Sequence, residues 1–192
     1  ALESKGPYDK SQKAMAHRSL RNTCLSYLQE TPVGHRLAES QLASSDNMTD
    51  TLAALRGLVW KKAQAAPRVL AEFESRWSDD GLVMDKWFIL QSTSPAANVV
   101  ETVRGLLNHR SFSMSNPNRV RSLIGAFASS NPAAFHAEDG SGYQFLVEML
   151  TELNQRNPQV ASRLIEPLIR LKRYDEKRQA LMRAALEQLK GL

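Results

Sequence analysis

The sequence predicts an all-α fold, a superhelical array of antiparallel helix pairs with about ten helices. Three observations lead to this prediction. Apolar residues recur at spacings of three to five along nearly the whole chain, close to the period of a helix with one buried face. Short breaks rich in proline, glycine, asparagine and serine divide the chain into segments of roughly 10 to 18 residues. No segment shows the alternation of a half-buried β-strand, so stacked helical hairpins are the expected architecture.

Four helices are expected in the first 77 residues, because proline and polar breaks interrupt the helical periodicity there. The predicted ranges are about 10–29, about 34–44, 48–62, and Pro67 to Trp77. Thr49 and Asp50 supply capping oxygens near the start of the third of these helices. The first helix is expected to bury one apolar face, formed by Met15, Leu20, Cys24 and Leu28.

Several of the remaining helices are expected to begin where asparagine or serine precedes proline. Ser94-Pro95 predicts a helix over about 95–108, whereas residues 82–90 are hydrophobic on most sides and predict a central buried helix. Pro167 predicts a kink or a split in its helix. The other expected starts are Asn116-Pro117, Asn131-Pro132, Gly140, Asn157-Pro158 and Tyr174. Stacked pairs of such helices form a HEAT/armadillo-like array, although the sequence shows no repeat consensus.

The net charge of +5 is concentrated at the end of the chain. Residues 156–192 hold nine basic and four acidic residues, whereas residues 1–155 are neutral overall. A surface that binds nucleic acid usually adds aromatic side chains that stack on bases, and this region has only Tyr174, so we expect no nucleic-acid partner. No apolar run approaches the roughly 20 residues of a membrane-spanning helix. We therefore expect no membrane contact. The single cysteine fits a reducing compartment, so we expect a cytoplasmic location.

Motifs that carry chemistry are few. The four histidines form no His-Glu-x-x-His motif and there is no Cys/His cluster, so the sequence predicts neither a zinc site nor a catalytic residue in this chain. At 100° per residue, four polar side chains fall within about 60° of one helix face. They are Gln159, Arg163, Glu166 and Arg170. This polar stripe is either a solvated face or the wall of a cavity, where arginine would attract a peptide carboxylate or carbonyl.

Four segments closely resemble the bacterial alanyl aminopeptidase (aminopeptidase N) family, in the same order along the chain. They read GLVMDKWFILQ followed by SPAAN from residue 81, SNPNRVRSLIGAF from 115, NPAAFHAEDGSGY from 131, and NPQVASRLIEPLIRLKRY from 157. The resemblance implies zinc metallopeptidases that remove single N-terminal residues from peptides. Their Gly-Ala-Met-Glu-Asn and His-Glu-x-x-His motifs lie in a thermolysin-like catalytic domain. Neither motif occurs here, so the chain is expected to be inactive alone, with zinc bound in the longer parent enzyme.

The resemblance also implies a place for this chain in that enzyme. Residues 1–192 are expected to form a single all-helical domain, part of the C-terminal domain, which caps the catalytic domain of the same chain. Such a cap encloses an internal cavity and controls the access of peptide substrates. By the resemblance, Gln159 and Arg163 line the substrate pocket and Arg121 lines the substrate channel, while His136 receives no role. The alternative is an independent helical-repeat scaffold that binds a partner protein.

Overall fold

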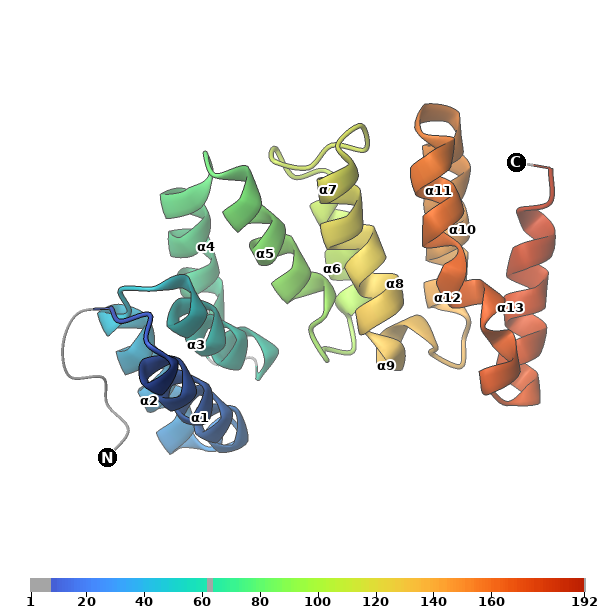
Figure 1. Ribbon diagram of the computed structural model, residues 1–192. Helices are drawn as coiled ribbons and strands as arrows, with labels where there is room; N and C mark the ends of the chain where they lie inside the picture. Colours follow the sequence, from blue (N-terminus) through green and yellow to red (C-terminus); the bar gives the residue numbers. More distant parts are fainter. Residues whose placement is uncertain (1–7, 62–63, 192) are drawn as a thin grey trace. The chain divides into compact units, whose positions relative to one another are not determined.

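The computed structural model describes residues 8–61 and 64–191, in which all regular secondary structure is helical (Figure 1). The prediction of an all-α fold is confirmed. Thirteen α-helices and two short turns of other helix types occur in these residues, because two of the expected helices are each divided into several segments. The chain forms two compact units, unit 1 (residues 1–76) and unit 2 (residues 77–192). The ends of the expected domain 1–192, and the expected helix end at Lys62, lie outside the described residues.

Unit 1 contains three helices packed against one another, followed by a fourth. Their bounds are α1 (Gln12–Leu28), α2 (Pro32–Ser44), α3 (Met48–Trp60) and α4 (Ala66–Trp77), the last residue of which belongs to unit 2. The first three helices each begin after a residue whose side-chain oxygen accepts a hydrogen bond from a free backbone N–H of the first turn. These capping residues are Ser11, Thr31 and Asn47.

A buried carboxylate, that of Asp50, holds unit 1 together. It forms an ion pair with Arg21 and accepts hydrogen bonds from Nδ2 of Asn22 at 2.9 Å and of Asn47 at 2.8 Å. Burial alone would raise the pKa of Asp50, but the hydrogen bonds from Asn47, Arg21 and Asn22 outweigh it and hold that pKa below its ordinary value. Asp50 therefore joins α1 to α3. The expectation that Thr49 and Asp50 cap α3 is corrected, because Asn47 is the cap.

The buried face of α1 differs from the prediction. Met15, Leu20 and Leu28 are 50%, 54% and 41% exposed, and Cys24 is only partly buried. A charged carboxylate such as Asp50 is stable in the interior only where cationic and amide donors reach it, so α1 directs a mainly polar row inward. This row follows the spacing i, i+3, i+4, i+7 and consists of Arg18, Arg21, Asn22 and Leu25.

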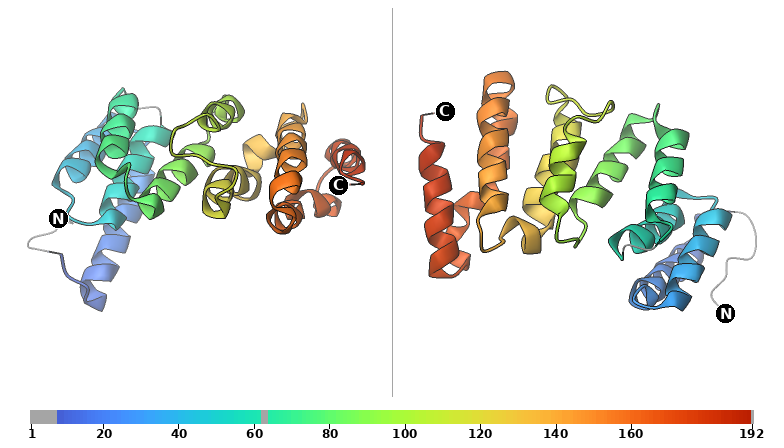
Figure 2. Two further views of the ribbon diagram at one scale, coloured as in Figure 1. Left: turned by 90° about the horizontal axis from the view of Figure 1, so that it is seen from above. Right: turned by 180° about the vertical axis from the view of Figure 1, so that it is seen from behind.

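Unit 2 arranges its helices in two layers (Figures 1 and 2). The segments are α5 (Gly81–Ser92), α6 (Val99–Leu106), α7 (Pro117–Val120), the π-helical turn η1 (Arg121–Gly125), α8 (Ala126–Ser130), α9 (Pro132–Phe135), α10 (Ser141–Arg156), α11 (Pro158–Leu164), α12 (Glu166–Ile169), the 3₁₀ turn η2 (Leu171–Arg173) and α13 (Glu176–Gln188). The front layer of Figure 1 contains α7, η1, α8 and α11, and α6 and α10 lie behind it. Contacts of α10 with α11 and of α6 with η1 join the layers.

The interior of unit 2 is aromatic. Phe127, Phe135 and Phe145 are fully buried, and the ring of Phe127 meets the other two edge to face at centroid distances of 5.9 and 5.5 Å. The buried helix predicted over 82–90 is present as α5, although Leu82 and Ile89 are exposed. The apolar side chains that α5 buries are Val83, Met84, Trp87, Phe88 and Leu90.

The helix starts predicted at Asn-Pro are confirmed. The side-chain oxygens of Asn116, Asn131 and Asn157 each accept a backbone N–H bond, and proline occupies the next position. The split near Pro167 is also confirmed, because α11 and α12 are separate helices. Both signals are local, since a cap and a missing N–H act within one turn of the chain.

The predicted start at Ser94-Pro95 is wrong, because α6 begins at Val99. The chain at Ser94 is held by a residue far along the sequence. Nδ2 of the buried Asn131 donates to the carbonyl of Ser92 at 3.0 Å and to that of Ser94 at 2.8 Å. These two bonds satisfy carbonyls that would otherwise be buried without partners, and this outweighs the local capping signal.

Candidate functional site

The three predicted site residues are exposed on the front layer of unit 2. Gln159 lies in the first turn of α11 and Arg163 in its last, whereas Arg121 begins η1. Within the described residues, the side chains of Gln159 and Arg163 have no hydrogen-bond or ion-pair partner. Arg121 has a single long hydrogen bond there, from Nη1 to Oδ1 of Asn118 at 3.4 Å. Their donors are therefore available to a ligand.

The predicted polar stripe along 159–170 is an exposed face. Gln159, Arg163, Glu166 and Arg170 are all exposed, and the stripe continues from α11 across the break at Ile165 to Arg170, which directly follows α12. Arg170 forms an ion pair with Glu166 one turn earlier. The opposite side of both helices is buried in unit 2 and consists of Val160, Ala161, Leu164 and Leu168.

A close approach at Gly125 brings the segment of Arg121 against α11. A Cβ added to Gly125 would lie 3.1 Å from Cδ2 of Leu164, closer than ordinary van der Waals contact, so the side chain of Leu164 would have to shift by a few tenths of an ångström. Arg121 precedes Gly125 by one helical turn, and Arg163 directly precedes Leu164. The structure therefore places Arg121 and Arg163 on two segments that touch, although they are far apart in the sequence.

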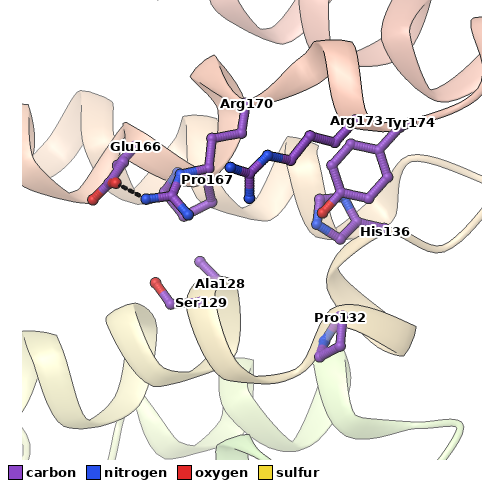
Figure 3. A pocket seen from close by; sticks show the side chains of 9 residues that line it. All are labelled: Ala128, Ser129, Pro132, His136, Glu166, Pro167, Arg170, Arg173 and Tyr174. Carbon is purple, nitrogen blue, oxygen red and sulfur yellow. Dashed lines mark hydrogen bonds and ion pairs between the residues drawn. The ribbon is translucent and has the colours of Figure 1, made fainter.

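A pocket of about 210 Å³ opens between α8–α9 and α12–η2 (Figure 3). We name it the arginine pocket, and its lining consists of Ala128, Ser129, Pro132, His136, Glu166, Pro167, Arg170, Arg173 and Tyr174. Figure 3 shows the side chains of Arg170 and Arg173 reaching from the α12–η2 wall toward the wall that carries Ala128 and Ser129. Glu166 and Arg170 belong to both the stripe and the pocket, so the two features form one continuous surface.

The arginine pocket has an excess of positive charge. Arg170 is paired with Glu166, but the side chain of Arg173 has no ion-pair or hydrogen-bond partner within the described residues. Two guanidinium groups and one carboxylate leave the pocket with one uncompensated positive charge. A concave site of this kind concentrates anions near its opening.

The buried polar member of the lining is His136. Its Nδ1 lies 2.8 Å from the hydroxyl oxygen of Tyr143, and its ring stacks on Tyr174 with centroids 3.9 Å apart. Burial, and then the positive charge of Arg178, lower the pKa of His136, which favours the neutral imidazole at pH 7. Burial also raises the pKa of Tyr143 to about 12. This uncharged pair therefore supports the ring of Tyr174 as a fixed wall of the pocket.

The sequence contains almost no signal for the arginine pocket. Its walls come from residues 128–136 and 166–174, which meet only through packing. The one local indication is Tyr174, the single aromatic residue of the basic C-terminal segment.

Metal-binding side chains do not cluster in the part of the chain that the structure describes. Residues 8–61 and 64–191 contain no group of three or more histidine, cysteine, aspartate or glutamate side chains that could hold a metal ion. The same residues contain no helix that is both long and apolar enough to cross a bilayer.

Comparison with known proteins relates this chain to aminopeptidases. It is 66% identical over 187 residues to aminopeptidase N of Escherichia coli (strain K12), covering 96% of this chain and 22% of that protein. Identity to aminopeptidase N of Haemophilus influenzae is 51% over 182 residues, covering 95% and 21%. The crystal structure of Legionella pneumophila aminopeptidase A in complex with aspartic acid superposes with a TM-score of 0.88 at 30% identity, covering 97% and 23%. The chain thus spans about a fifth of the length of the relatives it matches.

A sequence model of a protein family identifies the family of this chain. The model described as "Domain of unknown function (DUF3458_C) ARM repeats" matches residues 1–192, which confirms the prediction of a helical-repeat array. The resemblance of the four segments to the aminopeptidase N family is confirmed by the relatives above. The chain therefore belongs to the DUF3458_C family of ARM-repeat domains and corresponds to a helical part of bacterial aminopeptidases N.

Proposed function

We propose that this chain is the helical cap of a zinc-dependent aminopeptidase that removes single N-terminal residues from peptides in the cytoplasm. In this proposal it forms part of the C-terminal domain, packs on the catalytic domain of the same polypeptide and encloses the active-site cavity. The cap controls which peptides enter. The names of the relatives and the extent of the match support this assignment.

One observation carries the role of the site residues: the exposed, unpartnered row of Gln159 and Arg163 on α11, beside the segment of Arg121. A surface side chain can form its hydrogen bonds with water, so exposure alone assigns nothing. Three polar side chains on two packed segments of one layer, however, suit an extended peptide, whose carbonyl groups repeat along its length. Arginine offers a rigid fork of N–H donors to carbonyl and carboxylate oxygens.

The contribution of this chain to the reaction is then to bind and orient the peptide. Zinc would polarise the scissile carbonyl and activate water, and the described residues offer no ligand set that fits it. We therefore place the metal in the catalytic domain outside this chain. Holding the peptide in one orientation raises the fraction of bound substrate that can react, so a loss at Gln159 or Arg163 reduces kcat/KM.

The test is a pair of substitutions in the full-length enzyme. Arg163→Ala and Gln159→Ala should each lower kcat/KM for peptides by about five- to tenfold, the effect of losing one partly solvated hydrogen bond in the transition state. The loss should differ between peptides with different side chains, while the zinc content stays normal. Arg183→Ala is the matched control, because Arg183 is exposed on α13 and bonds only to Gln179 among the described residues. Peptide kinetics equal to the wild type in both variants would overturn the role of the stripe.

A further inference from the structure

We propose that the arginine pocket binds the C-terminal carboxylate of a peptide, with the guanidinium group of Arg173 as its main donor. This inference rests on the proposed function and extends it, since it assigns the far end of the bound peptide. It depends on five residues that the resemblance to the aminopeptidase family did not assign, namely Ser129, His136, Arg170, Arg173 and Tyr174.

The charge of the pocket selects a monoanion. Like charges close together repel, so two neighbouring arginines need compensation, and Glu166 compensates Arg170 alone. The one remaining positive charge is equal in magnitude and opposite in sign to the charge of a carboxylate. A phosphate dianion fits less well, because the ionised Glu166 would repel its second charge. Arginine also matches the two oxygens of a carboxylate with two parallel N–H donors.

The size and the lining of the pocket suit the C-terminal residue of a peptide. Its volume of about 210 Å³ exceeds that of a single water molecule, about 30 Å³, several times over. Ala128, Pro132 and Pro167 supply apolar surface for a small side chain, and the exposed Ser129 contributes a hydroxyl on the wall opposite the arginines (Figure 3). Polar donors that converge over an apolar lining are typical of small-ligand sites.

One wall of the pocket is held in place. Tyr174 stacks on the buried His136, which in turn contacts the hydroxyl of Tyr143, and Arg178 Nε donates to the carbonyl of His136 at 2.7 Å. The backbone carbonyl of Tyr174 accepts a bond from Nε2 of Gln179 at 2.8 Å. Because Tyr174 directly follows Arg173, this anchoring restricts the backbone from which the unpaired arginine extends. A restricted donor loses less entropy on binding.

The distance along the stripe sets the length of the peptide. Eleven residues separate Gln159 from Arg170, and an unbroken helix of that length would span roughly 16 Å at 1.5 Å per residue, so the bend at the break between α11 and α12 limits the separation to about this value. An extended peptide advances about 3.3 to 3.6 Å per residue, so a chain that contacts both residues needs about five residues. A pentapeptide is therefore the appropriate probe.

The experiment compares pentaalanine having a free C-terminus with its C-terminal amide, both as substrates of the full-length enzyme. We expect Arg173→Gln to lower kcat/KM for the free acid by about five- to tenfold and to lower it much less for the amide, because the amide keeps one carbonyl acceptor but carries no negative charge for Arg173 to pair with. Lys172→Gln is the matched control. It removes one exposed positive charge from the adjacent residue, which does not line the pocket. The control should leave the ratio of acid to amide at the wild-type value.

Two outcomes overturn the proposal: an unchanged acid-to-amide ratio in Arg173→Gln, or an equal change of that ratio in Lys172→Gln. A second measurement keeps this test separate from the proposed function. Saturation-transfer NMR on the full-length protein, with N-acetylated pentaalanine and its amide as probes, reports binding without turnover. Weaker binding of the acid to Arg173→Gln than to the wild type supports the pocket, even if Arg163→Ala leaves the peptide kinetics unchanged and the role of the stripe is overturned. Equal binding of the acid to the wild type and Arg173→Gln, with altered kinetics in Arg163→Ala, leaves the stripe intact and removes the pocket.

Discussion

The two units of this chain stabilise their interiors by different means. Unit 1 surrounds a buried carboxylate, Asp50, with an arginine and two asparagines, whereas unit 2 packs the rings of Phe127, Phe135 and Phe145 against one another. An aromatic cluster gains free energy from any close packing of apolar surface, whereas a buried carboxylate requires each of its donors in place. The two units are both built from α-helices, but their interiors should respond differently to substitution and to pH.

The largest expected effect comes from breaking the aromatic interior. Phe127→Ala should lower the free energy of unfolding by about 4 kcal/mol, because it removes a fully buried ring that contacts two others and leaves a cavity. Urea denaturation of the 192-residue chain measures the loss, and hydrogen-exchange mass spectrometry should locate it in residues 77–191. A loss below about 1 kcal/mol would show that the site collapses easily and that the cluster contributes little.

Disrupting the polar interior of unit 1 should lower the free energy of unfolding somewhat less. Asp50→Ala leaves the largely buried guanidinium of Arg21 without its carboxylate and should lower the free energy of unfolding by about 3 kcal/mol. Faster hydrogen exchange should be confined to residues 8–61. Glu39→Ala removes an exposed carboxylate elsewhere in unit 1, whose one partner among the described residues is Arg68 at 4.0 Å, and should change the free energy of unfolding by less than about 0.5 kcal/mol. Equal effects of the two substitutions would contradict the role given to Asp50.

The pH dependence of stability should separate the two interiors further. The pKa of Asp50 is lower in the folded chain than its ordinary value, so its stabilising contribution is complete above that value and is lost as the pH falls through the folded pKa. Melting temperatures followed by circular dichroism should therefore fall more steeply between pH 5 and pH 3 in the wild type than in Asp50→Asn, which cannot titrate. Parallel curves for the two proteins would mean that other carboxylates dominate acid unfolding.

The smallest effect on stability is expected at the stripe. Arg163→Ala removes an exposed side chain without a partner among the described residues, so the free energy of unfolding should change by less than about 0.5 kcal/mol. Thermal denaturation of the chain provides the check. Stability equal to the wild type, combined with reduced kcat/KM in the full-length enzyme, assigns Arg163 to binding. A loss above about 1 kcal/mol would instead show that it supports the fold.

Features that depend on near neighbours could be predicted from the sequence. The caps at Asn116, Asn131 and Asn157, the split near Pro167 and the exposed stripe from Gln159 follow from interactions within a few residues of the chain, and the structure has them all. A missing N–H or a capping oxygen acts within one helical turn, so its effect can be predicted from the neighbouring residues in the sequence. The periodicity also predicted the all-α class and the buried side chains of α5.

Features that depend on distant partners could not be predicted from the sequence. α1 turns its polar row inward because Asp50 of α3 needs its donors, and Ser94 fails to start a helix because Asn131 binds its carbonyl. The arginine pocket forms where two segments meet, and the side chain of Arg173 has no partner among the residues that the structure describes. In each case the free energy of satisfying or packing a group comes from residues far along the chain, which no local pattern contains.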